Sequence, residues 1–186
     1  AMGQGEPFLN YDATLAAMRK LNEKQGLNIG ARHIAVSTCG LIDGIERLAA
    51  ELEQFTLAVS LHSAVQPIRD ALMPKVASQP LGMLREALLR YVDTTGRRVT
   101  LEHLLIKDVN DSNDDLAALI DFCRGMICHV NLLPMNPVPG TSLDGASQQR
   151  LKEWRDVLEA RHIDASIRVS HGSDIAGACG QLKNSL

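Results

Sequence analysis

Short apolar runs alternate with segments of helical periodicity along this chain, and that alternation limits the possible folds more than any other feature. The runs are typical of buried strands and lie at 33–38, 56–62, 99–106, 129–133 and 165–169. Apolar residues recur at helical spacing at 11–25, 42–52, 84–92, 114–123 and 147–160. Regular strand–helix alternation predicts an α/β fold, a parallel sheet with its helices outside. Five such units are too few for a closed barrel, so we expect an open, partial β/α barrel of about five strands.

The chain is expected to form a single domain over residues 1–186, with residues 170–186 as a functional tail. Its 186 residues are enough for one sizeable core. The loop at 134–145 is rich in Pro and Gly but too short to be a linker between domains. No apolar run approaches the roughly 18 residues of a membrane span, so no membrane partner is expected.

The cysteines and the charge balance narrow the function further. Cys39, Cys123, Cys128 and Cys179 follow neither a redox nor a zinc spacing, so no metal site is predicted and free thiols in a reducing cytoplasm are expected. The net charge is −3 and aromatic residues make up 3% of the chain. A general polyanion-binding surface or a base-stacking platform is therefore not expected, and any RNA contact must be local or come from another segment.

Polar residues follow the predicted strands, where ligands bind in parallel α/β folds. Ser37 ends the first strand, Ser60-Leu61-His62 ends the second, and Asn136 follows the fourth. Each has a plain alternative, because Ser and Asn also form loops and Asn-Pro often starts a turn. His62 could be a general base or have a structural role. Glu102, inside an apolar strand, either points into the barrel mouth or pairs with an arginine.

Both ends of the chain carry candidate chemistry. The opening segment 3–7 sets Gly5 and Glu6 in a Gly-rich loop that suits a carboxylate directed at an ammonium group, although such starts are often simply flexible. In the tail, Cys179 lies between Ala178 and Gly180, which leave its sulfur open. The alternative is an incidental cysteine in a disordered C-terminus.

These stretches together resemble a known family. The run 174–182, Asp-Ile-Ala-Gly-Ala-Cys-Gly-Gln-Leu, closely resembles the C-terminal signature of the radical-SAM 23S ribosomal RNA adenine methyltransferases, the RlmN/Cfr family. The opening Gly-Gln-Gly-Glu-Pro is similar to that family's Gly-Met-Gly-Glu-Pro loop, with Gln4 in place of Met. Further matching stretches are Val-Ser-Thr-Cys-Gly, Ala-Val-Ser-Leu-His, Val-Asn-Asp-Ser and His-Val-Asn-Leu-Leu-Pro-Met-Asn-Pro-Val-Pro-Gly. The resemblance covers essentially the whole chain.

The resemblance implies a site and a reaction. Gly5 and Glu6 would hold the amino group of S-adenosylmethionine, and Cys179 would carry the methyl group as S-methylcysteine on its way to adenine. The remaining positions that match the family's cofactor contacts are Ser37, Ser60, Leu61, His62 and Asn136. For His62 a structural role or a contact with the cofactor ribose is favoured over base chemistry.

The resemblance also implies parts that this sequence does not contain. The family's CxxxCxxC motif, which holds a 4Fe-4S cluster, and its resolving cysteine both precede the Gly-Glu loop and are not found in this sequence. The chain is therefore expected to be the C-terminal portion of a longer enzyme and inactive alone. Implied partners are 23S rRNA, with tRNA a further candidate, and an electron donor for the cluster.

Two readings stay open beside the favoured one. The segment 171–174, His-Gly-Ser-Asp, differs from the family's common Arg-Gly-Asp-Asp, so carbon 8 of adenine remains an alternative to the favoured carbon 2. A truncated, non-catalytic barrel module is the other alternative.

Overall fold

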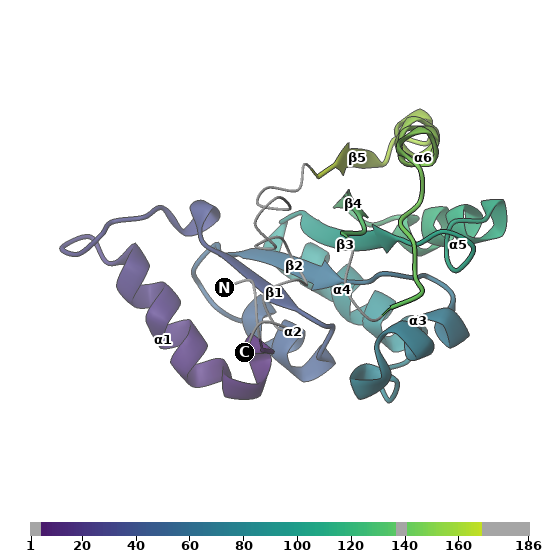
Figure 1. The fold of residues 1–186 in the computed structure, drawn as a ribbon. Coiled ribbons are helices and arrows are strands. Elements are labelled where there is room, and N and C mark those ends of the chain that lie inside the picture. Colours follow the sequence, from purple (N-terminus) through teal and green to yellow (C-terminus); the bar gives the residue numbers. More distant parts are fainter. Residues whose placement is uncertain (1–4, 137–140, 169–186) are drawn as a thin grey trace.

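A computed structural model describes residues 5–136 and 141–168 (Figure 1). Within them, five strands form one sheet in the order β1-β2-β3-β4-β5, and every neighbouring pair is parallel. The strands are β1 Ala35–Thr38, β2 Thr56–Ser60, β3 Val99–Leu105, β4 Cys128–Pro134 and β5 Asp164–Ile167. The helices are α1 Tyr11–Asn22, α2 Ile42–Ala49, α3 Gln66–Leu72, α4 Leu81–Thr95, α5 Asn113–Cys123 and α6 Gln148–Ala160. Short 3-10 turns are η1 Pro7–Asn10, η2 Ala31–His33 and η3 Pro74–Val76.

The strand order follows the chain order, which decides where the crossover helices go. Parallel β-α-β units cross over with a right hand, so consecutive units added in one direction place their helices on the same face of the sheet. The result is part of a barrel wall rather than a sheet covered by helices on both faces. The predicted open, partial parallel barrel of five strands is confirmed.

The two faces of the sheet differ in chemistry, because successive strand residues point to opposite sides. On the helix face the side chains form the core and are fully buried: Val36, Leu57, Val59, Leu101, Leu105, Val130 and Leu132. The positions between them form the other face, here called the open face: residues 35 and 37 of β1, 56, 58 and 60 of β2, 100, 102 and 104 of β3, 129, 131 and 133 of β4, and 164 and 166 of β5. Most of these are half-buried and many are polar.

Element boundaries agree with the sequence pattern, and the differences have local causes. Helix α4 ends at Gly96, whose φ of 63° is left-handed and suits a glycine C-cap. Helix α5 begins with a capping box between Ser112 and Asp115. Strand β2 ends two residues earlier than predicted because His62 adopts a φ of 56°. In α6 the side chains of Leu151, Trp154 and Leu158 are buried, whereas Val157 is 38% exposed.

One helix was not predicted. Helix α3 has little apolar periodicity, since its single buried residue is Arg69. A charged side chain at the inward position removes the signal on which a helix prediction depends. No helix in the described part of the chain is long and apolar enough to cross a membrane.

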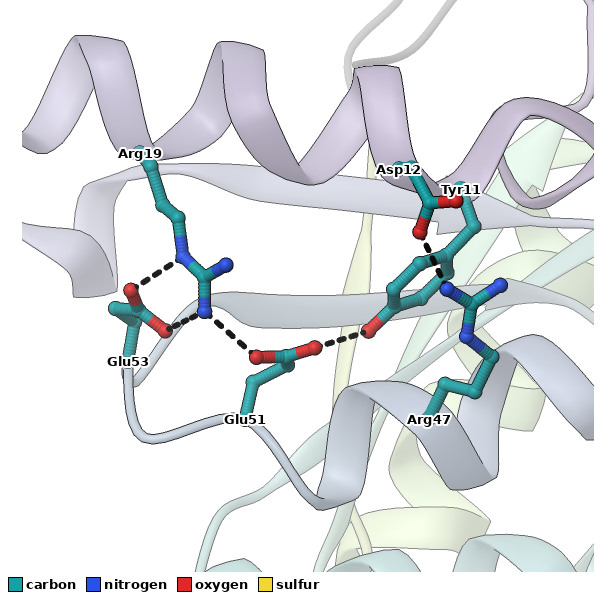
Figure 2. A network of polar contacts seen from close by, with 6 residues as sticks. All are labelled: Tyr11, Asp12, Arg19, Arg47, Glu51 and Glu53. Carbon is teal, nitrogen blue, oxygen red and sulfur yellow. Dashed lines mark hydrogen bonds and ion pairs between the residues drawn. The ribbon is translucent and has the colours of Figure 1, made fainter.

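Helix α1 is fastened to the rest of the fold by a polar network (Figure 2). Arg19 forms ion pairs with Glu51 and Glu53, and the hydroxyl of Tyr11 donates a hydrogen bond to Glu51. Arg47 lies 3.8 Å from the centre of the Tyr11 ring and pairs with Asp12. We call these six residues the α1 network.

A close contact at η1 explains one glycine. A Cβ added at Gly44 in α2 would lie 2.4 Å from the ring of Phe8. Because only a hydrogen fits there, Gly44 lets η1 and the start of α1 pack directly on α2.

Candidate functional site

A row of polar side chains crosses the open face at one level of the sheet. Ser60 pairs in register with Glu102, Glu102 with Asn131, and Asn131 with Ser166. Since all four alternate positions face the same side, the row runs continuously over four strands. We call these four residues the open-face row.

Hydrogen bonds join three members of the row, Ser166, Asn131 and Glu102, into a directed chain. The side-chain amide of Asn131 donates to a carboxylate oxygen of Glu102 at 2.9 Å. Ser166 donates to the amide oxygen of Asn131 at 3.3 Å, and Nε2 of His129 lies 2.7 Å from the Ser166 hydroxyl. Each bond fixes the orientation of the next side chain, so the Glu102 carboxylate is held in one position.

Glu102 is the unusual member of the row. Its side chain is buried, with 5% of its surface exposed. Burial raises the pKa of its carboxyl, while the hydrogen bond from Asn131 and the charge of Arg168 act in the opposite direction. The sequence left open whether Glu102 points into the barrel or pairs with an arginine. It lies on the open face, and none of the ion pairs within the described residues includes it.

The segment Ser60-Leu61-His62 carries three predicted site residues in different environments. Ser60 lies on the open face, half-buried. The side chain of Leu61 is fully buried in the core, and its backbone N–H already donates to the carbonyl of Glu102. A ligand contact of Leu61 would therefore use its carbonyl oxygen, which also accepts the N–H of Ser63.

His62 is held in one tautomer. Its Nδ1 accepts a hydrogen bond from the backbone N–H of Leu104 at 3.1 Å, so its proton lies on Nε2. Burial, with the nearby charge of Arg69, lowers the pKa of His62 to about 4. A neutral ring whose one lone pair is occupied suits a hydrogen-bond donor better than a general base.

Glu6 is fixed at the carboxyl end of β1. One carboxylate oxygen accepts the backbone N–H of Phe8 at 3.0 Å, and the other accepts the N–H of Cys39 at 2.7 Å. Gly5 precedes it with a φ of 83°, a conformation that favours glycine. The two backbone contacts and a hydrogen bond with the Cys39 thiol position the carboxylate, and the remaining lone-pair capacity is available to a ligand.

Cys39 is a poor nucleophile in this environment. Burial, together with the neighbouring Glu6 carboxylate, raises the pKa of its thiol to about 12. Cys123 and Cys128 are buried beside each other in the core, as expected for packing residues.

Two residues that shape the strand ends were not identified as site residues from the sequence. Asn110 is fully buried, and its amide group donates to the carbonyls of His62 and Leu104 while its oxygen accepts the N–H of Ile106. It thereby joins the loop after β2 to the end of β3. In the sequence, Asn110 belongs to the Val-Asn-Asp-Ser stretch. That stretch predicts a turn, but it does not show that the Asn110 side chain connects two strands.

Arg69 is the second. It is fully buried and donates from Nη2 to the carbonyl of Cys39 at 2.7 Å. Its Nε and Nη1 are buried and have no hydrogen-bond partner within the described part of the chain. Arg69 thus fixes the turn at the end of β1 and adds positive charge beside His62.

The other predicted site residues are Ser37, Asn136 and Cys179. Ser37 lies on the open face of β1 and Asn136 two residues beyond β4. Cys179 and the tail lie outside the described residues, as do 1–4 and 137–140. The structure therefore brings Ser37 and Ser60 to one face and Glu6 to the end of β1. Among the described residues, no group of three or more His, Cys, Asp or Glu side chains could hold a metal ion.

Known proteins resemble this chain over its whole length. It is 41% identical over 182 residues to a probable dual-specificity RNA methyltransferase RlmN of Clostridium novyi, covering 98% of this chain and 53% of that protein. It is 44% identical over 186 residues to the corresponding protein of Pelotomaculum thermopropionicum, covering all of this chain and 50% of that one. No family model matches the sequence. The chain spans about half the length of the curated relatives it matches.

Solved structures agree with the sequence relatives. A radical SAM methyltransferase from Sphaerobacter thermophilus superposes with a TM-score of 0.93 at 48% identity, covering 97% of this chain and 53% of that one. A domain of pyruvate-formate lyase-activating enzyme from Bacteroides vulgatus superposes with a TM-score of 0.66 at 16% identity, covering 89% and 96%, which shows a shared fold alone. The predicted resemblance is confirmed: the chain is similar in sequence to proteins named RlmN RNA methyltransferases, is similar in sequence and fold to a radical SAM methyltransferase, and spans about half the length of each.

Proposed function

We propose that this chain is the cofactor-binding and methyl-carrying part of a radical SAM methyltransferase that acts on adenine of 23S rRNA at carbon 2. In this proposal residues 1–186 form one domain, the C-terminal portion of the enzyme, with 170–186 as its catalytic tail. The relatives carry the name dual-specificity RNA methyltransferase, so tRNA is a second substrate to test. The free thiols of Cys39, Cys123 and Cys128 suit the reducing cytoplasm as the site of action.

The described residues fit S-adenosylmethionine. Ser60 at the end of β2 and the fixed Glu6 carboxylate at the end of β1 lie at the carboxyl side of the parallel sheet, where such folds bind ligands. Glu102 and Asn131 follow Ser60 in register across the open face and add a hydrogen-bond acceptor and an amide. The residues proposed to hold the cofactor are Gly5, Glu6, Ser37, Ser60, Leu61, His62 and Asn136. When bound next to a reduced 4Fe-4S cluster, S-adenosylmethionine supplies a methyl group and the radical that activates it.

Three residues of this chain have separate proposed roles toward the cofactor. Glu6 accepts hydrogen bonds from the ammonium group and so orients the methionine moiety. His62 donates from Nε2, since its Nδ1 is occupied by the Leu104 N–H. Cys179 would give its proton to a base or solvent, and its sulfur would then bond to the methyl carbon as the bond from that carbon to the sulfonium sulfur breaks. The products would be S-methylcysteine at position 179 and S-adenosylhomocysteine as the leaving group.

The cluster itself does not fit the described part of the chain, because no suitable group of ligands occurs there. Cluster ligands, the resolving cysteine and the docking surface for an electron donor are proposed to lie in the remaining half of the relatives' length. The chain alone is therefore expected to be inactive.

The observation that carries the proposal is the similarity at 41–44% identity over essentially the whole chain to RNA methyltransferases. The test uses the full-length protein, reconstituted without oxygen with iron and sulfide. It is incubated with 23S rRNA transcripts, tRNA and S-adenosylmethionine, and the nucleosides are analysed by mass spectrometry. We expect 2-methyladenosine.

Cys179→Ala should abolish product formation, whereas Cys123→Ala, a change in the core away from the open face, should retain it. Turnover by Cys179→Ala would overturn the role of this residue. A product methylated at carbon 8 would overturn the choice of carbon 2. The segment 171–174, which differs from the family's common Arg-Gly-Asp-Asp, would then be the first place to look for the cause. No methylated nucleoside in any arm would favour the non-catalytic module.

A further inference from the structure

Glu102 is a buried carboxylic acid in the middle of the open face, a position where a ligand could donate hydrogen bonds to it. It lies in register between Ser60 on β2 and Asn131 on β4, within the interior of the open face. Nothing in the family resemblance assigned it a role. The other carboxylate at an open-face position is that of Asp164, which is at the sheet margin and pairs with Arg98 at 3.0 Å.

The Glu102 carboxylate accepts fewer hydrogen bonds from the described residues than it has lone-pair positions. A carboxylate has about four lone-pair positions. Within the described residues its side chain accepts one hydrogen bond, from Asn131, and it has no ion-pair partner. An acceptor that is 5% exposed and so sparsely paired is costly unless something else donates to it.

The network behind Glu102 holds it ready for such a donor. Ser166 fixes the Asn131 oxygen, so the Asn131 amide nitrogen must point to Glu102. The carboxylate therefore does not need to be ordered when a ligand arrives, which reduces the entropy cost of binding.

We propose that Glu102 accepts hydrogen bonds from the ribose hydroxyls of S-adenosylmethionine. This inference rests on the proposed function. Two neighbouring hydroxyls are neutral donors that match an acceptor-only group, whereas an RNA phosphate would be repelled by it. Ser60, its register neighbour, belongs to the stretch proposed to hold the same cofactor.

The test separates a ribose contact from a structural role. Full-length wild-type protein and Glu102→Gln are titrated calorimetrically with S-adenosylhomocysteine and with its 2′-deoxy and 3′-deoxy analogues. Glu102→Gln should bind S-adenosylhomocysteine about 10- to 100-fold more weakly, the effect of losing a hydrogen bond to a charged group. At least one deoxy analogue should bind the wild type more weakly by a similar factor, yet bind Glu102→Gln no more weakly than S-adenosylhomocysteine does.

Two variants serve as controls. Asp164→Asn removes the same charge from the same face at the margin of the sheet and should bind all three ligands like the wild type. Glu102→Asp keeps the charge but withdraws the carboxylate by one methylene, and it should share most of the loss. Urea midpoints identify any variant that is not folded.

Each result decides the inference. Wild-type affinity in Glu102→Gln, or an equal loss for all three ligands, would overturn it, because a structural role does not depend on the ribose hydroxyls. A raised KM for RNA with unchanged ligand affinity would instead place Glu102 against the target nucleotide and would also overturn it. If the wild type binds none of the three ligands, the proposed function fails as well. That outcome is distinguishable from failure of the Glu102 inference alone, because it is seen in the wild-type protein without any variant.

Discussion

The α1 network and the open-face row are both polar, but they are organised in opposite ways. In the α1 network each acid has a basic or hydroxyl partner from another element, as Figure 2 shows. Its arginines and Asp12 are exposed to solvent, and Glu51 and Glu53 are half-buried. In the open-face row a single buried carboxylate is held by an amide and a serine, without a cation in hydrogen-bond range among the described residues.

The difference indicates what each network is for. In the α1 network, oppositely charged side chains pair with each other near the surface and hold the helix against the rest of the fold. Because they already have partners, few of their donors and acceptors remain for a ligand. A buried acceptor held in position by neutral donors stabilises the fold poorly, because its desolvation is not fully offset. Such an arrangement is typical of a site where the missing donor comes from a ligand.

The largest stability effect should come from the amide that supports Glu102. Asn131→Leu removes the one side-chain donor that Glu102 has among the described residues and leaves the buried carboxylate without a partner there, so the free energy of unfolding should fall by about 2–3 kcal/mol. Urea unfolding at pH 7 measures this change.

A double variant controls for the change in shape. When Glu102→Gln is already present, Asn131→Leu should cost clearly less, because no charge is then left unpartnered. If the two changes simply add, the row is not an energetic unit and its contrast with the α1 network disappears.

A smaller effect should follow pH. Burial raises the pKa of Glu102 in the folded protein, so the folded state holds this proton more tightly than the unfolded chain. The stability contributed by Glu102 is therefore complete below the unfolded pKa and is lost as pH rises through the folded one. Glu102→Gln lacks this loss, so its stability relative to the wild type should increase as pH rises from about 4 and level off above the folded pKa.

The difference between the two proteins is the quantity to measure, by thermal or urea unfolding at a series of pH values. His62 and His103 have pKa values lowered by burial to about 4 and about 3 and act in the opposite direction, but both are present in either protein. His129 and Arg168, the charged or titratable groups nearest to the row, are shared as well. A difference that does not change with pH would mean that Glu102 titrates normally.

The sequence predicted the fold well, because strand and helix periodicity depend on apolar residues at regular spacing. Strands β1 to β5 and helices α1, α2, α4, α5 and α6 follow from that pattern. Helix α3 did not, since its buried residue is an arginine. The turn at His62 was also missed, because a left-handed non-glycine residue has no periodic signal.

The candidate site was less accessible to sequence reasoning. Motifs identified residues near strand ends, such as Ser60 and His62, one segment at a time. The continuity of Ser60, Glu102, Asn131 and Ser166 depends on the register between four strands, which a single sequence does not encode locally. The roles of Asn110 and Arg69 depend likewise on which loops meet in space.

The smallest effect is expected in the α1 network. Tyr11→Phe removes the hydroxyl that donates to Glu51 at 3.2 Å but keeps the buried ring and its contact with Arg47. Glu51 retains Arg19 as a partner, so nothing is left buried and unpaired, and the free energy of unfolding should fall by no more than about 1 kcal/mol. Urea unfolding in low salt and in about 1 M salt provides the measurement.

Arg19→Ala is the matched comparison. Its effect on the free energy of unfolding should shrink in high salt, where exposed charges are screened within about 3 Å, while the effect of Tyr11→Phe should change less. A larger loss for Tyr11→Phe than for Asn131→Leu would reverse the contrast between the two networks and make α1 the more tightly coupled part of the fold.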